Sequence, residues 1–378
     1  MSISALSGPV IAFGQNTIGT VTDYNPDLGP SLFWGGVGRI DPRFPFNYIP
    51  GQASGAATFG FATSDCQTIS YAPYTLGNAA LAAAANVVSG TAMTLVSSNS
   101  TSTGVSTGAS CINFNTGATV TGLLLLDGFT SFTGVVASNV LTVSSLTGTV
   151  TVGMTLSGTG VATGTTVVNQ LTGAPGGAGT YTVTGNATVA SATITGQATG
   201  GPTQLAQPFG QPSTIYLWNP QAMVGRAVSI TGSASASGGN FLISGYDIYG
   251  VPMSEVIAGP ASNTTVNGKK AFKYIASVVP QFTNAQNYSA GTTDIFGFPL
   301  RSDFFSDVAI NYNAAAITAN TGFVAAVTTS PATTTTGDVR GTYALQSASD
   351  ASKRLAVRQF ILPANMGTSA GLFGVTQA

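Results

Sequence analysis

The sequence predicts an all-β protein with an antiparallel sandwich or jelly-roll-like base domain, an inserted small β-domain and an extended N-terminal arm. Three observations support this prediction. Glycine supplies 48 of 378 residues, and together with frequent threonine it favours turns and strands over helices. Apolar and polar residues alternate with period two along two long stretches of the chain. Only 6% of the residues are charged, whereas an average globular protein has about 25%, so solubility must depend on hydroxyl, amide and backbone groups.

The first segment, residues 1–55, is predicted to be an extended arm. Its centre, PSLFWGGVGRIDPRFPFNYIPG at 30–51, is dense in proline and aromatic residues. Proline at this density disfavours helix interiors and central strands. Aromatic side chains on an arm need a surface to cover, either a capsid or neighbouring subunit or the chain's own domain. The residues expected to make these contacts are Phe33, Trp34, Arg39, Arg43, Phe44, Phe46 and Tyr48.

The small β-domain is expected at 122–198. No charged residue occurs from 128 to 225. Within this stretch, short alternating segments are separated by glycine-containing turns, such as SGTG at 157–160 and GAPGGAG at 173–179. The expected strands are 140–143, 149–152, 165–168, 181–183 and 192–195.

The base domain is expected to combine 56–120 with 203–378. Alternation on two faces, with turn signals such as Ser-Gly-Gly-Asn and Val-Asn-Gly-Lys, is typical of an antiparallel sandwich or jelly roll. Its expected strands are 214–218, 227–230, 240–243, 255–257, 271–275 and 354–361. The small domain is therefore predicted to be an insertion that projects from the base.

Two stretches resemble structural proteins of tailed bacteriophages. Residues 156–195, through their glycines and the GTYTV element, resemble a small β-module that recurs in phage virion proteins, including tail-fibre and baseplate-associated ones. Residues 228–280 resemble a pattern found in phage head and other structural proteins, through the turn formed by Gly245, Asp247 and Gly250, the strand at Glu255 and the KKAFKYI strand. The resemblance implies a virion protein that assembles in the host cytoplasm, and it implies a homotrimer.

Two functions follow from this resemblance as expectations. The first is a capsid decoration or cement protein, or the base of a head fibre, which binds the major capsid protein lattice and projects the small domain. The alternative is a tail or fibre component that binds host surface glycans. A bacterial surface adhesin is disfavoured because the N-terminus, MSISALSGPVIAFGQ, lacks the basic and long apolar regions of a signal peptide. No stretch predicts a membrane span, and a net charge of −1 argues against a nucleic-acid partner.

The sequence predicts no enzymatic activity, no cofactor and no metal site. The chain has no histidine, so the two G-x-S-x-G matches, at 104–108 and 367–371, cannot complete a Ser-His-Asp triad. Asp303 and Asp307 lie beside Arg301 and could be interpreted as the carboxylate pair of a glycosidase. A loop with a local Arg-Asp ion pair is the simpler interpretation and the expected one.

The remaining charged positions are expected to be structural. Asp247 lies between glycines, and we expect a hairpin turn residue there rather than a calcium ligand. Lys269, Lys270 and Lys273 form the one dense positive cluster, which is expected on a solvated strand edge. The alternative for these lysines is contact with an acidic patch on a capsid neighbour.

The last charged group and the two cysteines complete the candidate positions. Asp350 has three basic residues near it, for which the same two interpretations stay open: Lys353, Arg354 and Arg358. Two cysteines in 378 residues are no disulfide framework. Cys66 and Cys111 are expected to be reduced and partly buried, with a bridge between them as the alternative.

Overall fold

The computed structural model describes residues 66–360 and 374–378, apart from 97–98, 101, 114, 152, 175, 198–202, 206–214, 218–223 and 331. The expected arm, residues 1–55, lies outside this part. All strand pairs in the described residues are antiparallel, and the helical content there is the single 3-10 turn η4 (Phe305–Asp307). The predicted all-β, sandwich-like fold class is therefore confirmed.

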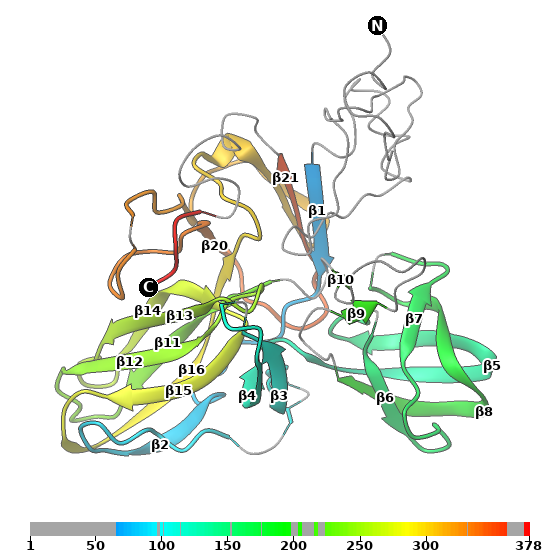
Figure 1. Cartoon of the computed structure of the whole chain (residues 1–378), viewed down its shortest axis with the longest axis horizontal. Helices are drawn as coiled ribbons and strands as arrows, with labels where there is room; N and C mark the ends of the chain where they lie inside the picture. The colour runs from blue at the N-terminus through cyan, green and yellow to red at the C-terminus, as the bar shows by residue number, and fades with distance from the viewer. Residues whose placement is uncertain are drawn as a thin grey trace, which may run out of the picture.

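Two sheets pack face to face as the main sandwich (Figure 1). The first contains β14 (Thr265–Phe272), β11 (Arg226–Gly232), β16 (Asn284–Gly297), β20 (Thr342–Ala344) and β19 (Phe323–Val324), with β2 (Ala82–Val87) also paired to β16. The second runs in the order β13 (Pro252–Ala258), β12 (Asn240–Tyr246), β15 (Tyr274–Pro280), β4 (Thr119–Leu125) and β3 (Ser106–Ile112). Strands from both halves of the chain thus build each layer.

The core of the sandwich follows the alternation in the sequence. In β12, Phe241 and Ile243 are buried and their neighbours are less so. Strand β13 repeats this pattern with Met253 and Ile257. Alternate side chains of a strand point to opposite faces, so one face of each strand is directed into the shared core.

The small sheet is built on two strands of 19 residues each, β5 (Phe129–Thr147) and β8 (Gly179–Gln197). They pair from Phe129 with Gln197 to Val143 with Gly179, through two register shifts. Strands β6 (Thr155–Gly158) and β7 (Val167–Gln170) both pair with β8. Figure 1 shows this sheet beside the main sandwich.

The core of the small sheet extends beyond it. Leu141, Tyr181 and Ile194 form one buried cluster with Cys111 of β3 and Tyr274 of β15. The apolar contacts therefore join the small sheet to the second sandwich layer. The division of the chain into an insert and a base stays a prediction.

The final sheet runs in the order β1 (Cys66–Tyr71), β21 (Leu355–Phe360), β17 (Val308–Tyr312) and β18 (Ala315–Ile317). A short pair, β9 (Thr203–Leu205) with β10 (Ile215–Leu217), forms a separate two-stranded sheet. Strands β21 and β10 occupy most of the expected segments 354–361 and 214–218. The four-stranded sheet packs against β16 and β20 through a third apolar cluster.

Two predicted strands are wrong. Residues 149–151 are buried in a loop, where the Thr149 hydroxyl accepts the backbone N–H of Ala72 at 2.8 Å. The expected strand 271–275 is two strands, because β14 ends at Phe272 and β15 begins at Tyr274. In both places every described residue is buried, whereas a half-buried strand would bury every second one, so the sequence pattern did not distinguish a strand from a packed loop or a corner.

Candidate functional site

The arm residues expected to bind a partner, from Phe33 to Tyr48, lie outside the described residues, so their role stays a prediction. The described residues instead bring charges together inside the molecule. Of the 17 charged residues described, eight are buried, in a chain with only 11 basic and 12 acidic residues. These eight are Arg226, Asp247, Glu255, Lys270, Lys273, Asp307, Asp338 and Arg340. Burying a charge is costly without a partner, so the contacts of these residues decide what the charges do.

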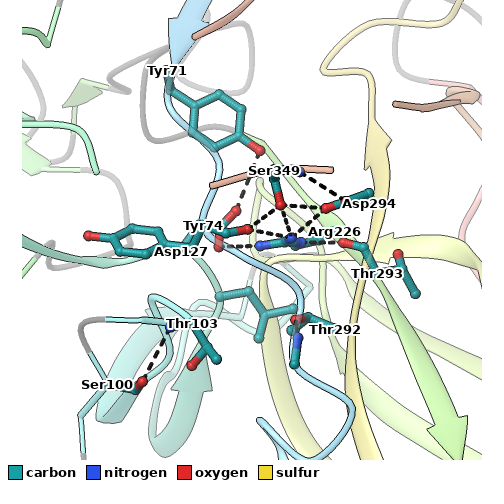
Figure 2. A network of polar contacts seen from close by, with 12 residues as sticks. Tyr71, Tyr74, Ser100, Thr103, Asp127, Arg226, Thr292, Thr293, Asp294 and Ser349 are labelled. Carbon is teal, nitrogen blue, oxygen red and sulfur yellow. Dashed lines mark hydrogen bonds and ion pairs between the residues drawn. The ribbon is translucent and has the colours of Figure 1, made fainter. Parts of the chain in front are cut away.

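The first charged cluster centres on Arg226, the first residue of β11 (Figure 2). Its guanidinium donates to the carboxylates of Asp127, in the turn after β4, and Asp294, in β16, both at 2.8 Å. It also donates to the backbone carbonyl of Tyr74 at 2.6 Å and to the Ser349 hydroxyl at 3.1 Å. One side chain therefore joins β11 and β16 to the segments after β1, after β4 and before β21.

The environment of Arg226 is closed on its other sides as well. Its Nε donates to the backbone carbonyl of Thr293, and its guanidinium carbon lies 5.1 Å from the centre of the Phe296 ring. The Ser349 hydroxyl lies 2.6 Å from the carbonyl oxygen of Tyr74. Figure 2 shows Tyr74, Asp127, Thr293, Asp294 and Ser349 around the guanidinium. We call Arg226 and these partners the Arg226 junction; the partners are Tyr74, Asp127, Thr293, Asp294, Phe296 and Ser349.

Burial and opposite charge act against each other in the Arg226 junction. Burial raises the pKa of Asp127, although Arg226 and Lys273 beside it act in the opposite direction. Burial alone would lower the pKa of Arg226, but Asp127, Tyr71 and Asp294 outweigh burial and raise it. Burial lowers the pKa of Lys273 to about 8, with Asp127 acting against that shift. The arginine therefore stays charged and holds its carboxylates in place.

The expected lysine-rich, solvated strand edge is corrected by the structure. Lys270 and Lys273 are buried, and Lys269 alone of the three is exposed. The Lys273 ammonium lies at the corner between β14 and β15 and donates to the backbone carbonyl of Leu126 at 3.0 Å. β14 is the edge strand of its sheet, as expected. The prediction of solvent exposure was wrong because both faces of the strand are covered at its C-terminal end, where Phe272 is also buried.

A second cluster surrounds the turn between β12 and β13. One oxygen of Asp247 accepts the backbone N–H groups of Tyr249 at 2.8 Å and Val251 at 2.9 Å, which confirms its predicted role as a turn residue. The other oxygen pairs with the Arg340 guanidinium at 3.0 Å, and both side chains are buried. Arg340 also packs over the Tyr249 ring at 5.2 Å. The turn is thereby fixed to the segment that leads into β20.

Two further carboxylates satisfy backbone donors of β14. Asp338 accepts the N–H of Ala271 at 3.0 Å, and one oxygen of Glu255 accepts those of Lys269 at 2.6 Å and Lys270 at 3.0 Å. The register between β11 and β14 shifts here, which frees these donors from the ladder. Burial raises the pKa of Glu255 to about 7. The second Glu255 oxygen and the Lys270 ammonium are buried without a hydrogen-bond partner.

The carboxylates near η4 contact residues close to them in the sequence, as predicted. Arg301 donates to both oxygens of Asp303, at 2.8 and 2.6 Å. Asp307 accepts the backbone N–H groups of Asp303 and Phe304, each at 3.0 Å. This pairing confirms the expected ion pair and assigns Asp307 to the stabilisation of the turn.

The other candidate positions form no catalytic constellation in the described residues. Ser106 of the first G-x-S-x-G match is buried in β3 without a hydrogen-bond partner, and the second match, 367–371, lies outside the described part. Asp350 pairs locally with Lys353 at 2.9 Å. Cys111 is free and buried, and burial raises its pKa to about 12. Among the described residues, no cluster of acidic and cysteine side chains could hold a metal ion.

Exposed hydroxyl pairs lie on the strands and loops of the small sheet. The paired oxygens are 2.8 to 3.2 Å apart in Ser157 with Thr195, Thr166 with Thr184, and Thr172 with Thr180. Cross-strand hydroxyl pairs of this kind stabilise a sheet without charge. They leave an uncharged surface that can form further hydrogen bonds.

The charged clusters were missed by sequence reasoning. Arg226 is an isolated charged residue flanked by apolar or small residues in MVGRAVS, whereas Arg340, in GDVRGTY, has Asp338 two residues before it. In a chain this poor in charge, such isolation is a signal for burial, because a solvated charge is rarely surrounded by core residues. The partners of Arg226 could not be inferred, since Asp127 and Asp294 lie 99 and 68 residues away.

The described residues contain no helix that meets the length and hydropathy of a membrane span. Comparison with protein-family models, curated proteins and solved structures found no match for this chain.

Proposed function

We propose that this protein is a non-enzymatic structural protein of a bacteriophage virion, acting as a capsid decoration or cement protein. In this proposal it binds the major capsid protein lattice as a homotrimer and projects the small sheet outward. The observation that carries the proposal is where the charged residues lie in the structure. Scarce charged residues join sheets internally at Arg226 and Arg340, while the small sheet has none.

Such an arrangement suits a component of a shell. A buried arginine with two carboxylate partners fixes the relative position of the segments it joins, because the guanidinium cannot leave either carboxylate without losing an ion pair in a site shielded from water. Arg226 fixes β11 and β16 to segments near Tyr74 and Ser349. The resulting unit is held together internally, which leaves its surface and the segment before β1 for contact with other subunits.

The alternative is a tail or fibre component that binds host surface glycans. The observation in its favour is the set of exposed hydroxyl pairs on the small sheet, such as Thr172 with Thr180. Sugar hydroxyls can exchange hydrogen bonds with such groups. A glycan-binding assay on the intact protein, with T172V as the matched variant, tests this alternative.

Truncation tests the decoration proposal. A chain that starts at residue 56 should lose binding to empty phage heads while its oligomer stays folded, because the aromatic residues expected to contact the capsid are removed. The matched control is the full chain with V168A, which changes an exposed residue of the small sheet that the proposal directs away from the capsid. Full occupancy of heads by the truncated chain would contradict the proposal.

A further inference from the structure

An amine and a carboxyl group are buried without a partner on the side of the main sandwich where β13 and β14 lie against each other. The Lys270 side chain is fully buried, and its Nζ has no acceptor among the described residues. Glu255 is also buried, and its Oε2 has no donor in the same part of the chain. Most buried polar groups are hydrogen-bonded, so two unpaired groups of complementary reactivity in one place need an explanation.

The segment before β20 brings a second carboxyl group to this place. The carbonyl of Thr334 accepts the N–H of Val256 in β13 at 2.8 Å, and the buried Asp338 carboxylate accepts the N–H of Ala271 in β14 at 3.0 Å. Both β13 and β14 are edge strands of their sheets. Residues 332–340 therefore connect the two edges and close this side of the sandwich.

Lys270 lies between the two carboxyl groups. Glu255 Oε1 accepts the backbone N–H of Lys270 itself at 3.0 Å, and Asp338 Oδ2 accepts that of the next residue. Both carboxyl groups are thus anchored within one residue of Lys270. The lysine side chain has four rotatable bonds and is long enough to bring its nitrogen to either group without movement of the backbone.

Burial favours the uncharged form of all three groups. It lowers the pKa of Lys270, although Glu255 and Asp338 act in the opposite direction. It raises the pKa of Asp338, and it raises that of Glu255 to about 7. An uncharged amine is a nucleophile, and a carboxyl group with a pKa near neutral pH exchanges protons efficiently. The groups therefore have the properties that amide formation requires.

We propose that Lys270 and Asp338 form an intramolecular amide bond in the folded protein, with Glu255 transferring the proton. Nζ of Lys270 attacks Cγ of protonated Asp338, and a bond between nitrogen and carbon forms. Glu255 takes one proton from Nζ and delivers one to the Asp338 hydroxyl, whose bond to Cγ breaks, so that one water leaves. Glu255 is regenerated, and no other reactant is consumed.

The contacts of the two carboxyl groups assign their roles. Asp338 Oδ2 carries the negative charge that develops during the attack, and the N–H of Ala271 already points at it. Glu255 is held through Oε1 by the N–H groups of Lys269 and Lys270, which leaves Oε2 free to exchange protons. The bond would fasten residues 332–340 covalently to β14. The inference is independent of the capsid proposal, because it concerns the isolated protein.

Mass spectrometry of the denatured full chain tests this proposal. The protein should be lighter than its sequence mass by one water, and a digest should contain a branched peptide that joins Lys270 to Asp338. K270R and E255Q should each have their full sequence mass. The matched control is K269R, which changes the exposed neighbouring side chain and should keep the mass deficit.

The unsubstituted protein decides the question even where K270R or E255Q fails to fold. Full sequence mass in a protein that circular dichroism shows to be folded would overturn the proposal. A loss of water that the digest locates elsewhere, such as cyclisation of Asp127 with Gly128, would also overturn it. A branched peptide that joins Lys270 to Glu255, or a mass deficit that persists in folded E255Q, would overturn the roles assigned to the two carboxyl groups.

Discussion

Arg226 and Asp127 lie 99 residues apart in the sequence and meet in a buried ion pair with a nitrogen to oxygen distance of 2.8 Å. The uncharged small sheet occupies most of the chain between them. The ion pair therefore closes the loop of chain that contains this sheet, at the point where the chain leaves β4 and later returns as β11.

Removing the guanidinium should destabilise the whole protein. R226M leaves the buried Asp127 side chain and the half-buried Asp294 side chain without their arginine, and removing one partner of a buried ion pair typically costs about 3–5 kcal/mol. The free energy of unfolding in urea measures this loss. K353M, at a partly exposed pair with Asp350, should cost about 0–1 kcal/mol. Equal effects of the two substitutions would contradict a structural role for the Arg226 junction.

Stability should fall as pH rises through the titration of Glu255. Its pKa is raised to about 7 in the folded protein, above its ordinary value of 4.5, so the folded state binds more protons than the unfolded state between these values. The favourable contribution is complete below about pH 4.5 and is lost by about pH 7.

The variant E255Q isolates this effect. An amide stays neutral, and its oxygen can still accept the backbone N–H groups of Lys269 and Lys270. Unfolding free energies of both proteins between pH 4.5 and pH 7 should therefore diverge, with a flatter curve for E255Q. Parallel curves would show that Glu255 is ionised throughout this range.

Most strands could be predicted from the sequence, but the buried charged clusters could not. The alternation around Phe241 and Ile243 correctly predicted a strand, because period-two burial is a local property. The corner at Lys273 was missed, since its buried ammonium is satisfied by Leu126, which is distant in the sequence. Local patterns carry no information on such contacts, and the charged clusters depend on them.

The small sheet should depend on its apolar core. Leu141 is fully buried in β5, so L141A should cost about 2–5 kcal/mol of stability through lost contacts and the cavity left behind. V168A, at an exposed position of β7, should change stability by no more than about 0.5 kcal/mol. Thermal unfolding followed by circular dichroism measures both. A neutral L141A would contradict the packing described for this sheet.

The thiol of Cys111 should be unreactive in the folded protein. Thiolates react and thiols do not, and burial raises the pKa of Cys111 to about 12. In a C66S background, labelling with a maleimide at neutral pH should be slow until the chain is unfolded in urea. Labelling of the native protein at the rate of the unfolded chain would show that β3 opens readily or is exposed.

The most direct test of the proposed role is cryo-electron microscopy of purified phage particles that contain this protein. The decoration proposal predicts density that repeats across the icosahedral lattice, with the small sheet of β5 and β8 pointing away from the shell. Density at the tail vertex alone would contradict that role and would support the alternative of host recognition.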